Sequence, residues 1–372
     1  MLKYKSKLRL LKELDWKLIG TILLIFTFGL IMLSSATHAN ETGNYIQLYK
    51  QGLAFVLGII MIIIILSVDY NVLGKYYKEL YLVSLVLLAV VLLPFIGAEM
   101  GGARSWIKLG PLYLQTSELV KLTFILSYAK IVESKKGKLD NIKEILKLLL
   151  YAVPFLGLLF AQPDLGTAIV FSCIVVGMLF TAGLDMKIIK KAVIILLVSL
   201  PIIYLFMADH QKDRIEAFLN PEDPTKKGNY QVMQSMIAIG SGGFTGKGLY
   251  EGSQNQEDFL PVQESDFIFA VVGEELGVIG MAVLIALYII FLTRMIQIAR
   301  EAKDFYGTLI VIGVMSMFAY QIIQNIGMTV ALIPVTGVTL PFVSYGGSSL
   351  LTSLANIGLV LNVCMRRKKI NF

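Results

Sequence analysis

Ten long apolar segments dominate this chain and constrain its fold more than any other feature. Each approaches or exceeds the length needed to cross a hydrocarbon layer about 30 Å thick. Because backbone amides inside lipid need internal hydrogen-bond partners, segments of this composition are predicted to be α-helices. Only 16% of the residues are charged, whereas soluble domains carry about 25%. The sequence therefore predicts an all-α, polytopic membrane protein and excludes a set of soluble domains.

The predicted spans cover, in chain order, residues 18–36, 52–68, 80–98, 112–129, 145–161, 165–184, 192–208, 266–293, 308–333 and 342–365. We expect residues 1–372 to form a single membrane domain, with a large outer loop at 209–265 between the seventh and eighth helices. Residues 230–239 of this loop are apolar at helical spacing, which predicts a helix on the membrane surface. The glycines that follow predict tight backbone packing near a ligand or another helix.

The distribution of Lys and Arg indicates the direction of the chain. With the N-terminus inside, 24 of the 33 basic residues lie in inward segments, as the positive-inside rule requires. We therefore expect the tails, residues 1–17 and 366–372, in the cytoplasm. The net charge of +7 is then mainly a topology signal, with contacts to anionic membrane lipid at the basic ends. No nucleic-acid partner is expected.

Acidic residues mark the predicted start of the eighth helix. Asp266 is expected at its first turn on the outer face, either as a functional carboxylate or as a helix N-cap. Glu274 and Glu275 lie further along the same predicted helix. Two adjacent glutamates inside a membrane rarely both face lipid, so at least one is expected to meet a cavity or a partner.

Three further polar groups stand out before the sixth helix. The outward loop 101–110 carries Arg104, Trp106 and Lys108, which fit either an interfacial anchor or a phosphate-binding role. Glu118 and Lys121 are spaced i, i+3, which predicts an intramembrane ion pair with a functional or a purely structural role. Asp164 is expected to cap the sixth helix.

A proline- and glycine-rich turn at 333–349 joins the last two spans on the outside. Broken helix ends of this kind often frame substrate sites in membrane proteins. Ser344 and Gly346 are therefore candidate substrate-binding residues.

Together these motifs resemble the SEDS (shape, elongation, division and sporulation) family, and its RodA-type branch more than its FtsW-type branch. Residues 14–16 and 248–254 carry the elongation-type signal. The chain departs from the family pattern at Ser105 and at Gln115–Glu118. The stretches that carry the resemblance are residues 102–121, 162–168, 230–248, 261–277 and 334–349.

The resemblance implies a peptidoglycan glycosyltransferase in the bacterial cell membrane that polymerises lipid II for cell-wall elongation and cell shape. It places the essential carboxylate of the family on Asp266, and it implies a class B penicillin-binding protein, a transpeptidase, as partner. Asp266 would act as a general base, while cations would stabilise the pyrophosphate leaving group. The sequence shows no metal cage, although a divalent cation (Mg or Mn) on the lipid pyrophosphate fits this chemistry. The candidate cations are Arg104, Lys108, Lys121, Arg214 and Lys50.

Two other functions compete with this prediction. Charges inside the predicted spans would suit a lipid II flippase or an ion-coupled transporter. A non-enzymatic scaffold for the cell-wall machinery would need no catalytic residue on the outside. The position of the essential carboxylate distinguishes them, because an outer-surface Asp266 suits chemistry on substrate that has already been flipped.

Overall fold

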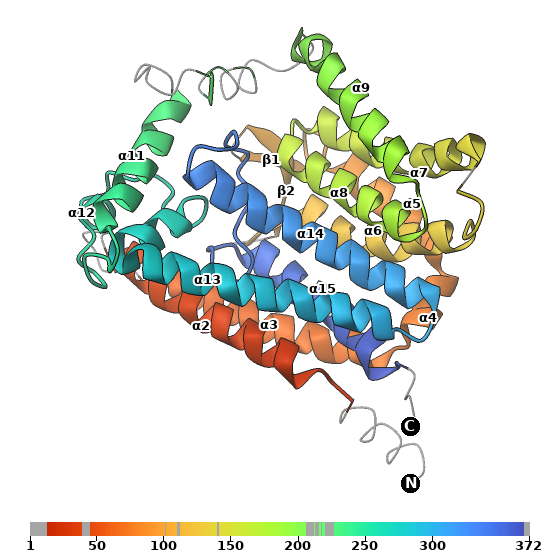
Figure 1. Ribbon diagram of the computed structural model, residues 1–372, viewed down its shortest axis with the longest axis horizontal. Coiled ribbons are helices and arrows are strands. Elements are labelled where there is room, and N and C mark those ends of the chain that lie inside the picture. The colour runs from red at the N-terminus through yellow and green to blue at the C-terminus, as the bar shows by residue number, and fades with distance from the viewer. Residues whose placement is uncertain are drawn as a thin grey trace.

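The computed structural model describes most of the chain and shows a bundle of helices (Figure 1). Each of the ten predicted spans corresponds to one helix. The described residues are 13–38, 45–100, 102–109, 112–139, 141–205, 212, 216, 218–219 and 227–367. The span helices are α2 (Trp16–His38), α3 (Ile46–Ser67), α5 (Tyr77–Val90), α6 (Thr116–Glu133), α7 (Ile142–Ala161), α8 (Leu165–Thr181), α9 (Met186–Leu205), α13 (Ile268–Glu301), α14 (Phe305–Thr329) and α15 (Gly347–Met365).

Six of these helices are long and apolar enough to cross a membrane on their own, namely α2, α3, α7, α13, α14 and α15. The others are shorter, like α5 and α8, or carry charged residues, like α6 and α9. Among the described elements, three further helices lie between the spans: α4 (Tyr70–Lys75), α11 (Lys227–Gly242) and α12 (Ser253–Gln256). The prediction of a helical, multi-pass membrane protein is confirmed.

A small antiparallel sheet corrects the all-helical expectation at one place. It contains β1 (Gly97–Met100), β2 (Ala103–Leu109) and β3 (Leu112–Gln115) in the order β1-β2-β3. The third predicted span therefore ends early, and the fourth begins at Thr116 rather than at residue 112. Side chains two residues apart share one face of a strand. In β2 this alternation is interrupted between Arg104 and Trp106, where the pairing with β1 shifts by one residue.

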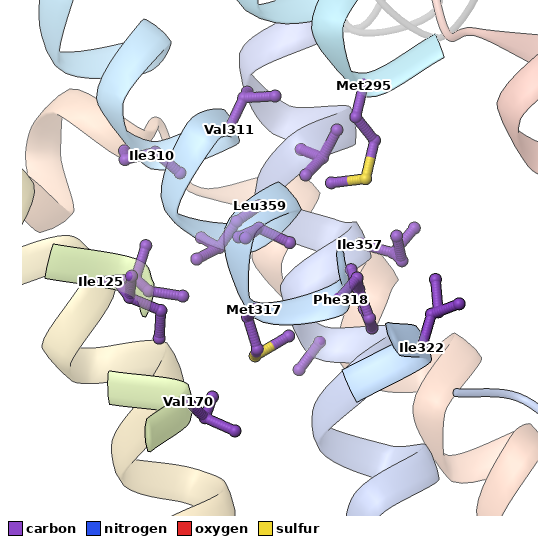
Figure 2. Close-up of a cluster of buried hydrophobic side chains, with 14 of the residues drawn as sticks. Ile125, Val170, Met295, Ile310, Val311, Met317, Phe318, Ile322, Ile357 and Leu359 are labelled. Carbon is purple, nitrogen blue, oxygen red and sulfur yellow. The ribbon is translucent and has the colours of Figure 1, made fainter. Parts of the chain in front are cut away.

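Helices α14 and α15 occupy the middle of the bundle (Figure 1). α14 packs against α6, α8, α13 and α15, while α15 lies along α3. Figure 2 shows buried aliphatic, methionine and phenylalanine side chains filling this centre, among them Ile125 of α6, Val170 of α8, Met295 of α13 and Leu359 of α15. Gly58 allows the close approach of α3 and α15, because a β-carbon there would lie 2.2 Å from Leu354 Cδ1.

Helix α13 is interrupted at Gly277, whose φ of 63° and ψ of −161° are not helical. The glycine-rich segment that follows α11 supplies the missing hydrogen bonds. The backbone N–H of Lys247 donates to the Glu274 carbonyl (3.0 Å), and the N–H of Val278 donates to the Gly243 carbonyl (3.1 Å). Every backbone group inside a membrane needs such a partner. The prediction that these glycines pack closely against another helix is confirmed.

Candidate active site

Asp266 lies in a turn directly before α13, half-buried on the rim of the bundle. Phe267 occupies the N-cap position, so the alternative that Asp266 is the helix N-cap is wrong. The Ser265 hydroxyl is 3.4 Å from Asp266 Oδ1. On the opposite side, a β-carbon at Gly337 would lie 3.8 Å from Asp266 Oδ2, so the turn 333–349 faces the carboxylate.

Two hydrogen bonds join the Asp266 segment to this turn, one from the Ser344 side chain and one from the Tyr345 backbone. The Ser344 hydroxyl donates to the Ser265 carbonyl (2.5 Å) and accepts a hydrogen bond from Leu340 N (2.8 Å). Tyr345 N donates to the Glu264 carbonyl (2.8 Å). Ser344 is 4% exposed, and its hydroxyl already bonds to the protein on both sides. Its observed role is to position the turn beside Asp266.

Two glutamines near the N-terminus of α3, which the sequence did not single out, hold this turn and the Asp266 segment. Gln51 donates to the Ser344 carbonyl (2.9 Å), and its side-chain oxygen accepts from Gly346 N (3.2 Å). Gln47, one helical turn earlier, donates to Glu264 Oε1 (3.2 Å). Gly346 thus contributes a backbone N–H to the turn. The i, i+4 spacing of two glutamines at the end of an apolar helix was the signal that could have revealed them.

The opposite end of the Asp266 segment is anchored to α2 and to the outer loop. The Gln263 side-chain amide donates to the carbonyls of Ala36 (3.1 Å) and Asn255 (3.2 Å). Gln263 is 4% exposed and stands three residues before Asp266. The backbone that carries Asp266 is therefore fixed at both ends.

Basic side chains gather on the sheet, which adjoins the same turn. Trp106 and Lys108 are two residues apart on β2 and share one face, whereas the pairing of β1 with β2 shifts by one residue between Arg104 and Trp106 and interrupts this alternation. Lys108 is exposed, with its ammonium 5.8 Å from the centre of the Tyr113 ring. The Ser348 hydroxyl donates to the Tyr113 carbonyl (3.1 Å), which joins β3 to the N-terminus of α15. The turn 333–349 thus connects the sheet with the Asp266 segment.

Lys50 and Arg214 are two further candidate cations. Lys50 is exposed on α3, next to the Gln51 that holds the turn. Arg214 lies outside the described residues.

Glu118 and Lys121 form the predicted ion pair, with Lys121 Nζ 2.6 Å from Glu118 Oε1. The exposed fractions of their side chains are only 9% and 2%. They lie in the first two turns of α6, directly after β3. Thr116 Oγ1 donates to the Ser105 carbonyl (3.2 Å) and ties the start of α6 to β2. The pair therefore lies beneath the sheet that carries Arg104 and Lys108.

Glu274 and Glu275 are both fully buried and both have partners, as expected for adjacent carboxylates in a membrane helix. Glu274 Oε1 accepts from the ammonium of Lys247 (2.7 Å). Glu275 Oε1 accepts from the Ser35 hydroxyl (2.5 Å) and the Asn255 side-chain amide (2.8 Å). These bonds hold the loop that precedes Asp266 against α13 and α2.

Asp164 caps α8, as the sequence predicts, because its carboxylate accepts from Thr167 N (3.1 Å). It also accepts from the Gln115 amide at the end of β3 (3.3 Å). Among the described residues, no three or more His, Cys, Asp or Glu side chains gather closely enough to hold a metal ion.

The fold and this site define a class: a multi-pass α-helical membrane protein with a braced carboxylate that faces a proline- and glycine-rich turn. The family model of the FtsW, RodA and SpoVE cell cycle proteins matches residues 15–369. The chain belongs to this family, which is the SEDS family that its motifs resemble.

Relatives from several branches of the family align along nearly the whole chain. The probable peptidoglycan glycosyltransferase FtsW of Trichlorobacter lovleyi is 36% identical, over 98% of this chain and 96% of its own length. Stage V sporulation protein E of Bacillus subtilis is 39% identical, over 94% and 96%. The peptidoglycan glycosyltransferase MrdB of Escherichia coli (strain K12) is 34% identical, over 94% of each chain.

Two solved structures share the fold. One belongs to a peptidoglycan synthase complex described as coordinating polymerization and crosslinking. It matches with a TM-score of 0.81 and 32% identity, over 95% of this chain and 98% of its own. The other is the rod shape determining protein RodA of Thermus thermophilus, with a TM-score of 0.72 and 31% identity, over 96% and 98%.

Proposed function

We propose that this chain is a peptidoglycan glycosyltransferase that polymerises lipid II into glycan strands at the outer face of the bacterial cell membrane. The observation that carries the proposal is Asp266, a carboxylate whose backbone is held from both sides and which faces the turn 333–349, the turn that also contacts the sheet carrying Arg104 and Lys108. The names of the relatives supply the reaction class. The elongation-type motifs at residues 14–16 and 248–254 favour a role in cell-wall elongation and cell shape.

The proposed topology places the active site where flipped substrate is available. Residues 1–372 form one membrane domain with both tails in the cytoplasm and the loop 209–265 outside, as the distribution of basic residues favours. Asp266 then lies at the outer membrane surface, next to the headgroup of lipid II.

In the proposed reaction, Asp266 accepts the proton of the acceptor's GlcNAc 4-hydroxyl as that oxygen attacks the anomeric carbon of the donor. The bond from this carbon to the phosphate oxygen breaks, and undecaprenyl pyrophosphate leaves with the electron pair, so the configuration inverts. A glycosidase needs an acid to protonate its leaving group, but a pyrophosphate leaves without one. Arg104 and Lys108 stabilise the charge that develops on it, with Lys50 and Arg214 as further candidates. A divalent cation would enter with the pyrophosphate.

The proposed partner is a class B penicillin-binding protein, which would crosslink the strands that this chain makes. The likeness to a subunit of a complex that couples polymerization to crosslinking supports this proposal.

The test is polymerisation of lipid II by the purified protein together with its transpeptidase partner. A general base contributes about 10²–10⁴-fold, so Asp266→Ala is expected to lower the rate to background while insertion and partner binding persist. Glu257→Ala is the matched control, because Glu257 is an exposed carboxylate of the same loop. Near wild-type glycan synthesis by Asp266→Ala would refute the role of Asp266.

A lipid II flippase is the alternative, and the same preparation tests it. Charges inside the spans would suit a flippase. However, Lys121 and Glu118 bond to each other, while Glu274 and Glu275 bond to residues of the loop before Asp266. Such paired charges are weak evidence for a transport path. Wild-type protein that moves labelled lipid II across vesicles without ever polymerising it would establish the flippase instead.

A further inference from the structure

We infer that Asn325 is a positioning residue that sets Asp266 in place through the backbone. Asn325 lies on α14 and is fully buried. Its side-chain amide donates to the carbonyl of Asp266 (3.0 Å) and to the carbonyl of Val338 (2.8 Å). The NH₂ group has two hydrogens, so one side chain holds both segments at once. The inference rests on the proposed role of Asp266 as the base.

The Asp266 carbonyl lies just before the hydrogen-bond ladder of α13. The ladder begins when Ala270 N donates to the Phe267 carbonyl (2.9 Å). The carbonyl of Asp266, one residue earlier, accepts a hydrogen bond from Asn325 of α14 instead. The position of the Asp266 backbone therefore depends on α14 as well as on its own helix.

The second bond of Asn325 fixes the surface that faces the carboxylate. Val338 follows Gly337, whose φ of 69° is in the left-handed region and whose β-carbon position lies 3.8 Å from Asp266 Oδ2. The same amide thus sets both sides of the gap next to Asp266. Loss of this amide would remove a donor from both carbonyls, of which the bond to Val338 is buried, and would let the two segments move apart.

The neighbouring residue on α14 provides a matched control. Gln324 donates to the Pro334 carbonyl at the start of the same turn (2.8 Å), and its oxygen accepts from the Tyr320 hydroxyl (3.1 Å). It is also an amide and is 2% exposed. Gln324 therefore braces the turn without bonding to Asp266, and comparing the two residues isolates the bond to the Asp266 carbonyl.

The kinetic test measures kcat and KM for lipid II in the purified complex. Displacing a catalytic group by about 1 Å can cost about 100-fold in rate. Asn325→Ala is therefore expected to lower kcat by roughly 10- to 100-fold and to leave KM little changed. Gln324→Ala should lower kcat far less. Asn325→Ser, which keeps one hydroxyl donor, should retain more of kcat than Asn325→Ala and also serves if the alanine variant does not fold.

A distance measurement tests the brace without relying on activity. Spin labels at Glu257→Cys and Leu332→Cys, both exposed positions, report the separation of the Asp266 segment from the turn. The native cysteines, Cys173 and Cys364, are replaced by serine. The distance distribution should broaden in Asn325→Ala and remain narrow in Gln324→Ala.

Two outcomes would overturn the inference. One is a wild-type kcat in Asn325→Ala while Asp266→Ala is inactive, because the base would then need no such brace. The other is an equal loss of kcat and equal broadening in the Asn325 and Gln324 variants, which would mean general support of the turn. Failure of the proposed function differs from both, since Asp266→Ala would then remain active.

Discussion

The two sides of the proposed active site are built in opposite ways. On the carboxylate side, the backbone around Asp266 is held by buried hydroxyl and amide side chains, with Ser344, Gln263 and Asn325 each bonding to main-chain carbonyls. On the cation side, the basic residues stand on a three-stranded sheet, and Lys108 is exposed with its ammonium 5.8 Å from the centre of the Tyr113 ring. One side is fixed by the protein, and the other extends long side chains toward solvent.

This difference fits the two chemical tasks. A general base must lie within hydrogen-bond reach of one hydroxyl, so a small displacement is costly. Charge stabilisation falls off gradually with distance, and several cations can share it. We therefore expect single substitutions to be severe where the site is buried and modest where it is exposed, and three variants test this rule.

On the cation side, the largest effect is expected at the buried ion pair of Glu118 and Lys121. Lys121→Ala leaves Glu118 without a counter-ion in a buried site, so the free energy of unfolding should fall by about 3–5 kcal/mol. The double variant Glu118→Gln/Lys121→Met should recover most of this loss, because it removes both charges. Unfolding in detergent micelles measures both values. If Lys121→Ala kept wild-type stability, burial would not determine how severe a substitution is on the cation side.

An intermediate effect is expected at Arg104. Arg104→Ala should lower kcat/KM for lipid II roughly tenfold, equivalent to about 1.4 kcal/mol, because other cations remain. The loss should shrink as salt rises, since ions screen exposed charges beyond about 10 Å at 0.1 M. Lys75→Ala removes the same charge from the predicted inner face and should leave the rate unchanged. A loss for Arg104→Ala as large as that for Asp266→Ala would break the comparison.

The helices could be predicted from the sequence because ten apolar runs leave lipid-embedded backbone few alternatives. The Glu118–Lys121 pair could be predicted because charges spaced i, i+3 share one helix face, and charges inside a membrane must pair. The strand at 112–115 was missed because Leu112, Tyr113 and Leu114 are apolar and fit the start of the next span equally well. The interruption at Gly277 was missed because its hydrogen bonds come from the loop after α11.

The candidate site was predictable only in part. The resemblance to the SEDS family supplied the role of Asp266, and the sequence indicated Arg104, Trp106 and Lys108 as candidates on an outward loop but not the strand that carries them. Gln51 and Asn325 were missed because the spacing of amides along an apolar helix does not show which carbonyls they bind. Their importance depends on carbonyls that are distant in sequence, and only the folded chain brings them together.

The smallest effect is expected at Asp164, a carboxylate close to the sheet whose observed role is local. Asparagine caps a helix about as well as aspartate, so Asp164→Asn should keep the bond from Thr167 N and change the free energy of unfolding by less than about 0.5 kcal/mol. Asp164→Ala removes the cap and should cost about 1 kcal/mol. Thermal unfolding and lipid II polymerisation, measured on both variants, check these values. If Asp164→Asn lost activity while its stability stayed at the wild-type level, Asp164 would belong to the active site. The exposure of a residue would then no longer distinguish the positions where a substitution is severe from those where it is modest.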